Sequence, residues 1–306
     1  MTDLLTAEDL AVPDLPLHGY VPGEVSFTYS HPGQSAFRRA LIRAVEGASG
    51  QPMLRRLYLD WRANPREGET VFAAALRLLR LELRLQGAAI AGVPREGGLL
   101  LVANHPFGIV DGLMIGHLGM QLRRNVRILT NSLLCQPPEL ARHLLPVDFS
   151  GTAEARRLSG ETRRRAAQAL AMGEAVAIFP GGGVATANRP VTGRAVDSAW
   201  HPFAGRLATL PGVTTLPLHF SGQNSRLFQI ASHLSYAMRV ALIFHETRRL
   251  MGRRVAVTVG EPLSAAELAR LPRAEVTDVL RRRTMELSAG GGDPDEVFVW
   301  PAHIRW

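Results

Sequence analysis

Two short apolar runs, each followed by residues that break regular structure, constrain the fold of this chain most. The first covers residues 99–103, with the sequence LLLVA, and leads into Asn104 and His105. The second covers residues 175–179, with the sequence AVAIF, and leads into Pro180 and three consecutive glycines. Apolar runs of this length are typical of strands buried on both faces, as in parallel sheets covered by helices on both sides.

Strand patterns alternate with helix patterns along the rest of the chain. Further strands are expected at residues 81–86, 127–130, 214–220 and 254–259, and helices at residues 112–121, 138–143, 152–172, 223–230 and 265–271. Such alternation predicts an α/β fold with a central, mostly parallel sheet flanked by helices.

The N-terminal part of the chain has a different pattern. Residues 1 to about 34 are rich in proline and glycine, which predicts an extended arm. Three amphipathic helices are expected next, at residues 35–46, 52–63 and 69–80, and would form an N-terminal helical layer. We expect residues 1–80 to pack on an α/β domain of residues 81–306 as a single structural unit.

The net charge of the chain indicates which classes of partner it can bind. The chain has 35 basic residues, all of them arginine, against 27 acidic ones, a net charge of +8. Such a charge attracts nucleic acid, phospholipid head groups or an acidic acyl carrier protein. Nucleic acid is disfavoured, because aromatic residues make up only 6% and are not interleaved with arginine.

The same composition bears on location. A single cysteine, Cys135, rules out an internal disulfide and fits a reducing cytoplasm. The N-terminal sequence lacks the pattern of a signal peptide, and no apolar stretch reaches the roughly 20 residues that cross a bilayer. We expect a cytoplasmic protein that associates peripherally with the inner face of the membrane.

The segment LLLVANHPFGIVDG, residues 99–112, carries the first candidate chemistry. His105 follows a predicted buried strand, and Asp111 opens a predicted helix six positions later, so the two side chains are expected to face each other across a turn. A carboxylate that orients an imidazole makes it an effective general base toward a hydroxyl group. The alternative is that Asp111 caps the helix and His105 is an ordinary polar residue at a strand end.

The glycine run after residue 179 is the second segment with candidate chemistry. Successive backbone N–H groups of Gly181, Gly182 and Gly183 can converge on an anion or a developing oxyanion. The alternative is a tight turn with a purely geometric role. Nucleotide binding is poorly supported, since the run matches neither a P-loop nor the dinucleotide-binding fingerprint.

These segments resemble the glycerolipid acyltransferase superfamily, the lysophosphatidate acyltransferase-like proteins. Asn104, His105 and Asp111 match its first block, and residues 179–184, FPGGGV, resemble its third block, Phe-Pro-Glu-Gly-Thr-Arg. Residues 215–220, TLPLHF, are similar to the fourth block. The resemblance covers residues 81 to 259 and implies a glycerol-3-phosphate acyltransferase-like fold.

The chain departs from the superfamily pattern in two places. Five residues, rather than four, separate His105 from Asp111, and Gly181 and Val184 replace the usual glutamate and arginine of the third block. The longer turn and the stretch HFSGQNSRLF resemble the bacterial branch once labelled putative hemolysins. The missing block-three arginine leaves the family's phosphate contact open.

The resemblance implies transfer of a fatty-acyl chain from acyl-CoA or acyl carrier protein to a lysolipid hydroxyl during membrane lipid synthesis. The acceptor is expected to be lysophosphatidate, another lysophospholipid or lyso-ornithine lipid. His105 and Asp111 are the expected catalytic residues, and neither a cofactor nor a metal is expected. The expected substrate contacts are Asn104, Gly108, Pro180, Gly181, Gly182, Gly183, Arg189, Arg194, Gln223, Asn224 and Arg226. The rival hypothesis is a non-catalytic protein that binds lipid or acyl carrier on the same fold.

Overall fold

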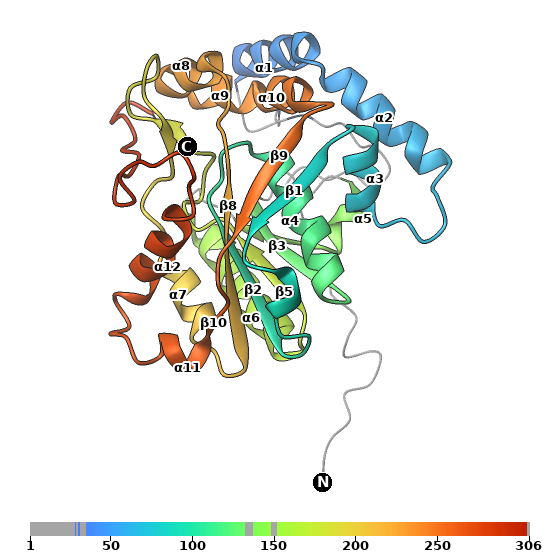
Figure 1. Ribbon diagram of the computed structural model, residues 1–306. Coiled ribbons are helices and arrows are strands. Elements are labelled where there is room, and N and C mark those ends of the chain that lie inside the picture. The colour runs from blue at the N-terminus through green and yellow to red at the C-terminus, as the bar shows by residue number, and fades with distance from the viewer. Residues whose placement is uncertain (1–27, 29, 31–34, 132–136, 148–151, 305–306) are drawn as a thin grey trace.

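The computed structural model describes residues 28, 30, 35–131, 137–147 and 152–304. Most of the predicted N-terminal arm and Cys135 lie outside these described residues. The described chain forms a sheet with helices on both faces and further helices at one end (Figure 1).

The central sheet has eight strands in the order β1-β9-β8-β2-β5-β3-β4, with β10 paired to β8. The strands are β1 (Glu82–Gly87), β2 (Gly98–Ala103), β3 (Val126–Asn131), β4 (Leu144–Val147), β5 (Ala175–Ile178), β8 (Val213–Phe220), β9 (Arg254–Val259) and β10 (Leu263–Ser264). Every neighbouring pair in the block β8-β2-β5-β3-β4 is parallel. The predicted mostly parallel sheet is therefore confirmed.

Strand β9 runs antiparallel to β8, and β1 runs parallel to β9, so these two strands oppose the main block. The alternating pattern of residues 81–86 predicted strand β1 but contained no information about its direction. In the main block, the carboxyl ends of β2, β5 and β8 lie side by side at one edge of the sheet, where α/β proteins place their ligands.

Helices cover both faces of the sheet. One layer contains α3 (Val71–Leu78), α4 (Ile109–Leu122) and α10 (Ile243–Leu250). The other contains α6 (Ala153–Ala171), α7 (Phe203–Ala208), α11 (Ala265–Leu268) and α12 (Val276–Met285). Within β2, Leu99 and Leu101 belong to the first core, and Leu100 and Val102 to the second. This explains why β2 is continuously apolar, because each side chain has a helical layer to contact.

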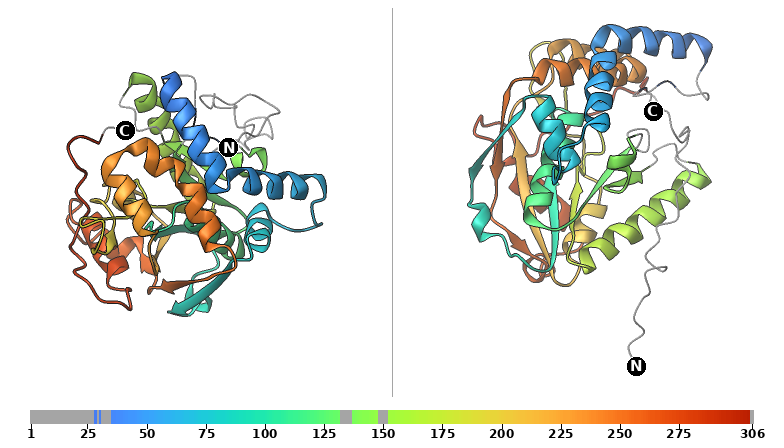
Figure 2. Two further views of the ribbon diagram at one scale, coloured as in Figure 1. Left: turned by 90° about the horizontal axis from the view of Figure 1, so that it is seen from above. Right: turned by 90° about the vertical axis from the view of Figure 1, so that its right-hand side faces the viewer.

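The predicted N-terminal helical layer is present as α1 (Ala36–Ser49) and α2 (Gln51–Ala63), together with α3. Gly50 separates α1 from α2 with a φ of 102°, and a Cβ there would lie 2.7 Å from the Arg248 side chain. Helix α1 packs against α9 (Tyr236–Ala241) and α10, and α8 (Arg226–Leu234) lies beside α9 (Figure 2). None of the described helices is long and apolar enough to span a membrane.

Several short elements were not predicted. They are β4, α7, α9, α10, β10, α12, the 3-10 turn Ile90–Gly92, and the hairpin of β6 (Thr186–Ala187) and β7 (Ala195–Val196). The predicted helix at residues 223–230 begins at Arg226 instead, because the Ser225 hydroxyl accepts the Phe228 N–H at 3.3 Å and caps the helix there. The predicted helix at residues 138–143 is the short α5 (Pro138–Ala141).

Candidate active site

The first predicted site residue, Asn104, joins two strand ends. Its Nδ2 donates to the Phe220 carbonyl at 2.9 Å, and its Oδ1 accepts the Phe220 N–H at 2.7 Å. Both polar groups of this amide are thus bonded to the backbone of the last residue of β8. Asn104 does not line the cavity described below, so the structure gives it a positioning role beside His105.

The predicted histidine and aspartate come together across the turn between β2 and α4. Nδ1 of His105 lies 3.0 Å from Oδ2 of Asp111, whose side chain is fully buried. The same Oδ2 accepts the N–H groups of Phe107 at 2.7 Å and Gly108 at 2.9 Å. One carboxylate oxygen therefore both caps the helix and lies close to the imidazole, so capping by Asp111 does not exclude its pairing with His105.

Gly108 allows this turn to close. Its φ is 82°, a conformation that favours glycine, and a Cβ would lie 3.2 Å from the Val184 side chain and 3.3 Å from that of Ile243. The five-residue spacing between His105 and Asp111 is thus compatible with a close pair, because the turn bends back at Gly108.

The imidazole is held from its other sides as well. The His105 ring stacks on Phe179, at the end of β5, with centroids 4.1 Å apart and planes at 24°. The His105 N–H donates to Oδ1 of Asp197 at 3.1 Å, and the His105 carbonyl accepts the Ala185 N–H at 2.7 Å. These contacts tie the strand end that carries His105 to the segment after the glycine run.

Asp197 is a buried residue beside His105 that the sequence analysis missed. It is buried, and Oδ2 accepts the Trp200 Nε1–H at 2.9 Å. A Cβ on Gly181 would lie 3.1 Å from the Asp197 Cβ. Asp197 therefore occupies the space that a larger side chain at position 181 would need, which gives a physical reason for glycine where the superfamily has glutamate.

The two buried carboxyl groups have similar electrostatics. Burial raises the pKa of Asp111, and the His105 ring together with the Phe107 and Gly108 N–H groups opposes that rise. Burial likewise raises the pKa of Asp197, and the Trp200 and His105 N–H donors oppose it. For each carboxyl group, these few donors favour the charged form against burial.

The three glycines of the run differ in their backbone hydrogen bonds and contacts. Gly182, with φ of 72°, donates its N–H to the Phe179 carbonyl at 3.0 Å, and Gly181 packs against Asp197. Gly183 lines the cavity, and no described residue accepts its N–H. Of the three predicted oxyanion donors, Gly183 is the one whose position fits that role.

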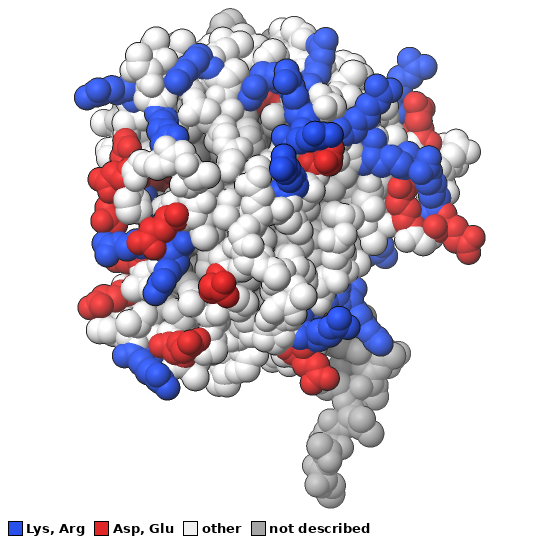
Figure 3. Space-filling model, in the orientation of Figure 1, with Lys and Arg blue, Asp and Glu red and all other residues white. Residues whose placement is uncertain are grey.

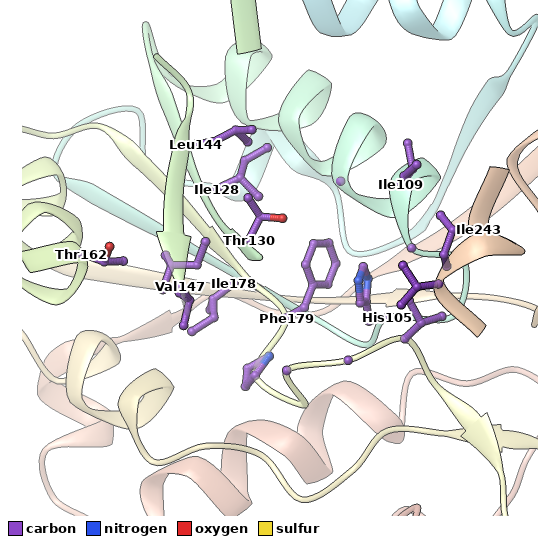
Figure 4. Close-up of a pocket in the computed structure, with 18 of the residues that line it drawn as sticks. His105, Ile109, Ile128, Thr130, Leu144, Val147, Thr162, Ile178, Phe179 and Ile243 are labelled. Atoms are coloured by element: carbon purple, nitrogen blue, oxygen red, sulfur yellow. The ribbon is translucent and has the colours of Figure 1, made fainter. Parts of the chain in front are cut away.

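A cavity of about 500 Å³ runs past the His105 ring. On one side of Phe179 it forms an apolar arm, whose walls include Ile128, Leu144, Val147 and Ile178 (Figure 4). On the other side of His105 lies a second end at Ile243 (Figure 4). The Val184 side chain approaches Gly108 together with that of Ile243, and Arg239 bonds to the Val184 carbonyl, so both residues belong to this second end of the cavity wall. His105 thus stands between the apolar arm and the end that contains Arg239.

The remaining predicted contacts divide into two groups. Gly108, Pro180, Gly182 and Gly183 line the cavity. The predicted contacts that do not are Asn104, Gly181, Arg189, Arg194, Gln223, Asn224 and Arg226.

Three of the distant members of the second group have other partners. Arg194 donates to the Gly291 carbonyl and Arg226 to the Gly193 carbonyl, while the Gln223 side chain accepts the Ala195 N–H. Asn224 is buried. In the described part of the chain, no group of three or more His, Cys, Asp or Glu side chains is placed to hold a metal ion.

A family model described as Acyltransferase matches residues 38–290. The chain belongs to this acyltransferase family. The resemblance to the glycerolipid acyltransferase superfamily, which rested on three short blocks, is confirmed by a match over most of the chain.

Two curated relatives of this acyltransferase are both described as lyso-glycine lipid O-acyltransferases. That of Phocaeicola vulgatus is 26% identical over 203 residues, covering 64% of this chain and 69% of its own. That of Bacteroides thetaiotaomicron is 24% identical over 190 residues, covering 60% and 67%. Among solved structures, the 1-acyl-sn-glycerophosphate (LPA) acyltransferase PlsC from Thermotoga maritima is 17% identical over 82% of both chains, with a TM-score of 0.40, too low to support an argument.

Proposed function

We propose that this protein transfers a fatty-acyl chain from a thioester donor to the hydroxyl group of a lysolipid, with His105 as general base. The observation that carries the proposal is the pair of His105 and Asp111, 3.0 Å apart, between an arm of the cavity with aliphatic side chains in its walls and the end that contains Arg239. Membership of the acyltransferase family and the names of the two relatives support the same reaction.

The reaction follows from this arrangement. Asp111 holds a proton on Nδ1 of His105, which leaves Nε2 free to accept the proton of the acceptor hydroxyl. The hydroxyl oxygen attacks the thioester carbonyl carbon, the C–S bond breaks, and the departing thiolate takes the proton back from Nε2. The charge on the tetrahedral oxygen is stabilised by the Gly183 N–H. No covalent intermediate with the enzyme is required.

The apolar arm is the part of the cavity that suits a fatty-acyl chain. Its aliphatic walls remove methylene groups from water, worth about 0.8 kcal/mol for each buried group. With the chain in this arm, the thioester carbonyl lies beside Phe179 and the His105 ring. The acceptor then approaches from the second end of the cavity.

The finer identity of the substrates is part of the proposal. The donor is acyl-CoA or acyl carrier protein, and the acceptor is lysophosphatidate, another lysophospholipid or a lyso-amino-acid lipid such as lyso-ornithine lipid. The relatives' names favour the amino-acid lipids, which carry a carboxylate instead of a phosphate. The product is a membrane lipid with two acyl chains.

We also propose peripheral binding to the inner face of the cytoplasmic membrane. Helices α1 and α2 expose Phe37, Leu41 and Met53, with fractional exposures of 79%, 40% and 36%. Arg43 and Arg56 on the same helices are exposed, and arginine side chains gather over this end of the molecule (Figure 3). Apolar side chains among arginines are suited to the headgroup region of an anionic bilayer.

The test is a panel of donors and acceptors with purified protein. Long-chain acyl-CoA and acyl carrier protein are each combined with lysophosphatidate, lysophosphatidylethanolamine, lyso-ornithine lipid and lyso-glycine lipid. We expect a new O-acyl ester, identified by tandem mass spectrometry, that does not form with His105→Gln. Donor binding without transfer to any acceptor would favour the non-catalytic hypothesis.

A further inference from the structure

Arg239 of α9 is the most deeply buried arginine of the cavity wall, with a fractional exposure of 3%. Its guanidinium group donates to the Thr186 and Ser232 hydroxyls and to the Val184 carbonyl. Three of the five N–H donors of a guanidinium are thus used, and two remain without a partner among the described residues.

No described carboxylate pairs with this cation. The Phe228 and Trp300 rings lie against it, with centroids 5.0 Å and 4.8 Å from Cζ. Ring contacts and neutral acceptors offset only part of the cost of burying a charge, and burial lowers the pKa of Arg239 to about 10. An unpaired cation inside a cavity wall is favourable once an anion binds beside it.

The position of Arg239 fits one part of the proposed substrate pair. Arg239 lines the cavity and bonds to the Val184 carbonyl, and the Val184 side chain lies with that of Ile243 beside Gly108, on the opposite side of His105 from the apolar arm. The guanidinium contacts the carbonyl of Val184, the residue that stands where the superfamily has its block-three arginine. A cation is therefore present beside this position, supplied by a different helix.

We propose that Arg239 binds the anionic head group, a carboxylate or a phosphate, of the lysolipid acceptor. This inference rests on the proposed function. With its hydroxyl at Nε2 of His105 and the donor chain in the apolar arm, the acceptor extends toward α9. The two remaining N–H donors are matched to two oxygens of one carboxylate or phosphate.

The other arginines of the cavity wall are less suited to this role. Arg156 and Arg163 lie on α6 beside the apolar arm, and both are exposed to solvent. Arg189, Arg194 and Arg226, which the sequence offered as substitutes for the missing arginine, do not line the cavity. Within the described structure, the buried cation at the acceptor end is Arg239.

The experiment compares each charged acceptor with a neutral counterpart. Lyso-glycine lipid is paired with its primary amide, and lysophosphatidate with monoacylglycerol, using one acyl donor throughout. For Arg239→Gln we expect kcat/KM to fall about 100-fold with the anionic acceptors, mainly through KM, and less than about 3-fold with the neutral ones. Arg239→Lys, which keeps the charge but loses the paired donors, should give an intermediate loss.

Arg281 provides a matched control, because it is a buried arginine that lies outside the cavity wall and donates to the carbonyls of Pro294 and Glu296. Arg281→Gln should leave the ratio between anionic and neutral acceptors at the wild-type value. The proposal is overturned if Arg239→Gln lowers kcat/KM equally for anionic and neutral acceptors and Arg239→Lys is equally impaired. Arg239 would then only stabilise the local structure.

The two anionic acceptors distinguish the sources of the anion. A larger loss with lyso-glycine lipid identifies a carboxylate site, and a larger loss with lysophosphatidate a phosphate site. If the wild type acylates no acceptor, the proposed function fails. The head-group site is then tested separately, by calorimetric measurement of the binding of the same four lipids. Equal binding of charged and neutral lipids to the wild type would then refute it.

Discussion

Ala155 offers a direct test of which space holds the acyl chain. It lies in the first turn of α6, is 1% exposed, and lines the cavity. Ala155→Leu adds three carbon atoms to the wall and removes room for about two to three methylene groups of a bound chain. At about 0.8 kcal/mol for each methylene, the longest accepted chain loses about 2 kcal/mol, equivalent to about 30-fold in kcat/KM.

The assay is competition among acyl thioesters of increasing length for one acceptor, with the products counted by mass spectrometry. We expect the preferred chain of Ala155→Leu to be shorter by about two carbons, with the rate for short chains within about 3-fold of wild type. Ala153→Leu, at an exposed position of the same helix, should keep the wild-type profile. An unchanged length profile in Ala155→Leu, together with a raised KM for the acceptor, would place the acyl chain elsewhere.

Three further substitutions test the electrostatics of the site and of the sheet. Asp111→Asn should lower the transfer rate by about 10²–10⁴-fold. It should not lower the melting temperature, since burial disfavours the charged carboxylate. An unstable but active variant would contradict this prediction. Asp197→Asn leaves the Trp200 Nε1–H without its acceptor and should cost about 1–3 kcal/mol in unfolding free energy, measured with urea, while also slowing transfer. Burial lowers the pKa of His219 from 6.5 to about 4, so between these pH values the unfolded chain takes up a proton that the native state does not. Stability should therefore fall by about 3 kcal/mol on acidification across this range, and urea curves of His219→Gln should lack most of that slope.

The parts of the site that the sequence predicted are those fixed by local structure. Residues 99–105 and 175–183 each combine a buried strand with the turn at its carboxyl end, so the position of His105 and the glycine run followed from hydrophobic pattern alone. Asp111 lies in the first turn of the next helix, and its approach to His105 requires only the bend at Gly108.

The parts that were missed depend on contacts between distant segments. Asp197 reaches His105 from 92 positions along the chain, out of a loop with no periodic pattern. The sequence did contain one indication of Arg239, which is a single arginine in an apolar helical stretch. Its contact with Val184, however, joins residues 55 positions apart. Strand β4 was missed because it has only four residues, one of them Pro146.

The predicted arginine contacts show the opposite error. Arg194 and Arg226 follow the glycine run and the fourth block closely in sequence, which suggested that they face the substrate. Arg194 lies in the loop of the β6-β7 hairpin and donates to the Gly291 carbonyl, and Arg226 donates to the Gly193 carbonyl of that same loop. Sequence proximity to a motif does not determine which side of a hairpin a side chain occupies.

The central claim, proton removal by His105, is tested most directly by single-turnover acyl transfer in His105→Ala. Excess enzyme is mixed with long-chain acyl-CoA and lysolipid, and the new ester is followed by rapid quench, with binding of a non-reactive thioether analogue measured in parallel. We expect unchanged analogue binding and a transfer rate lowered by at least about 10²-fold. Transfer at the wild-type rate with intact donor binding would contradict the account.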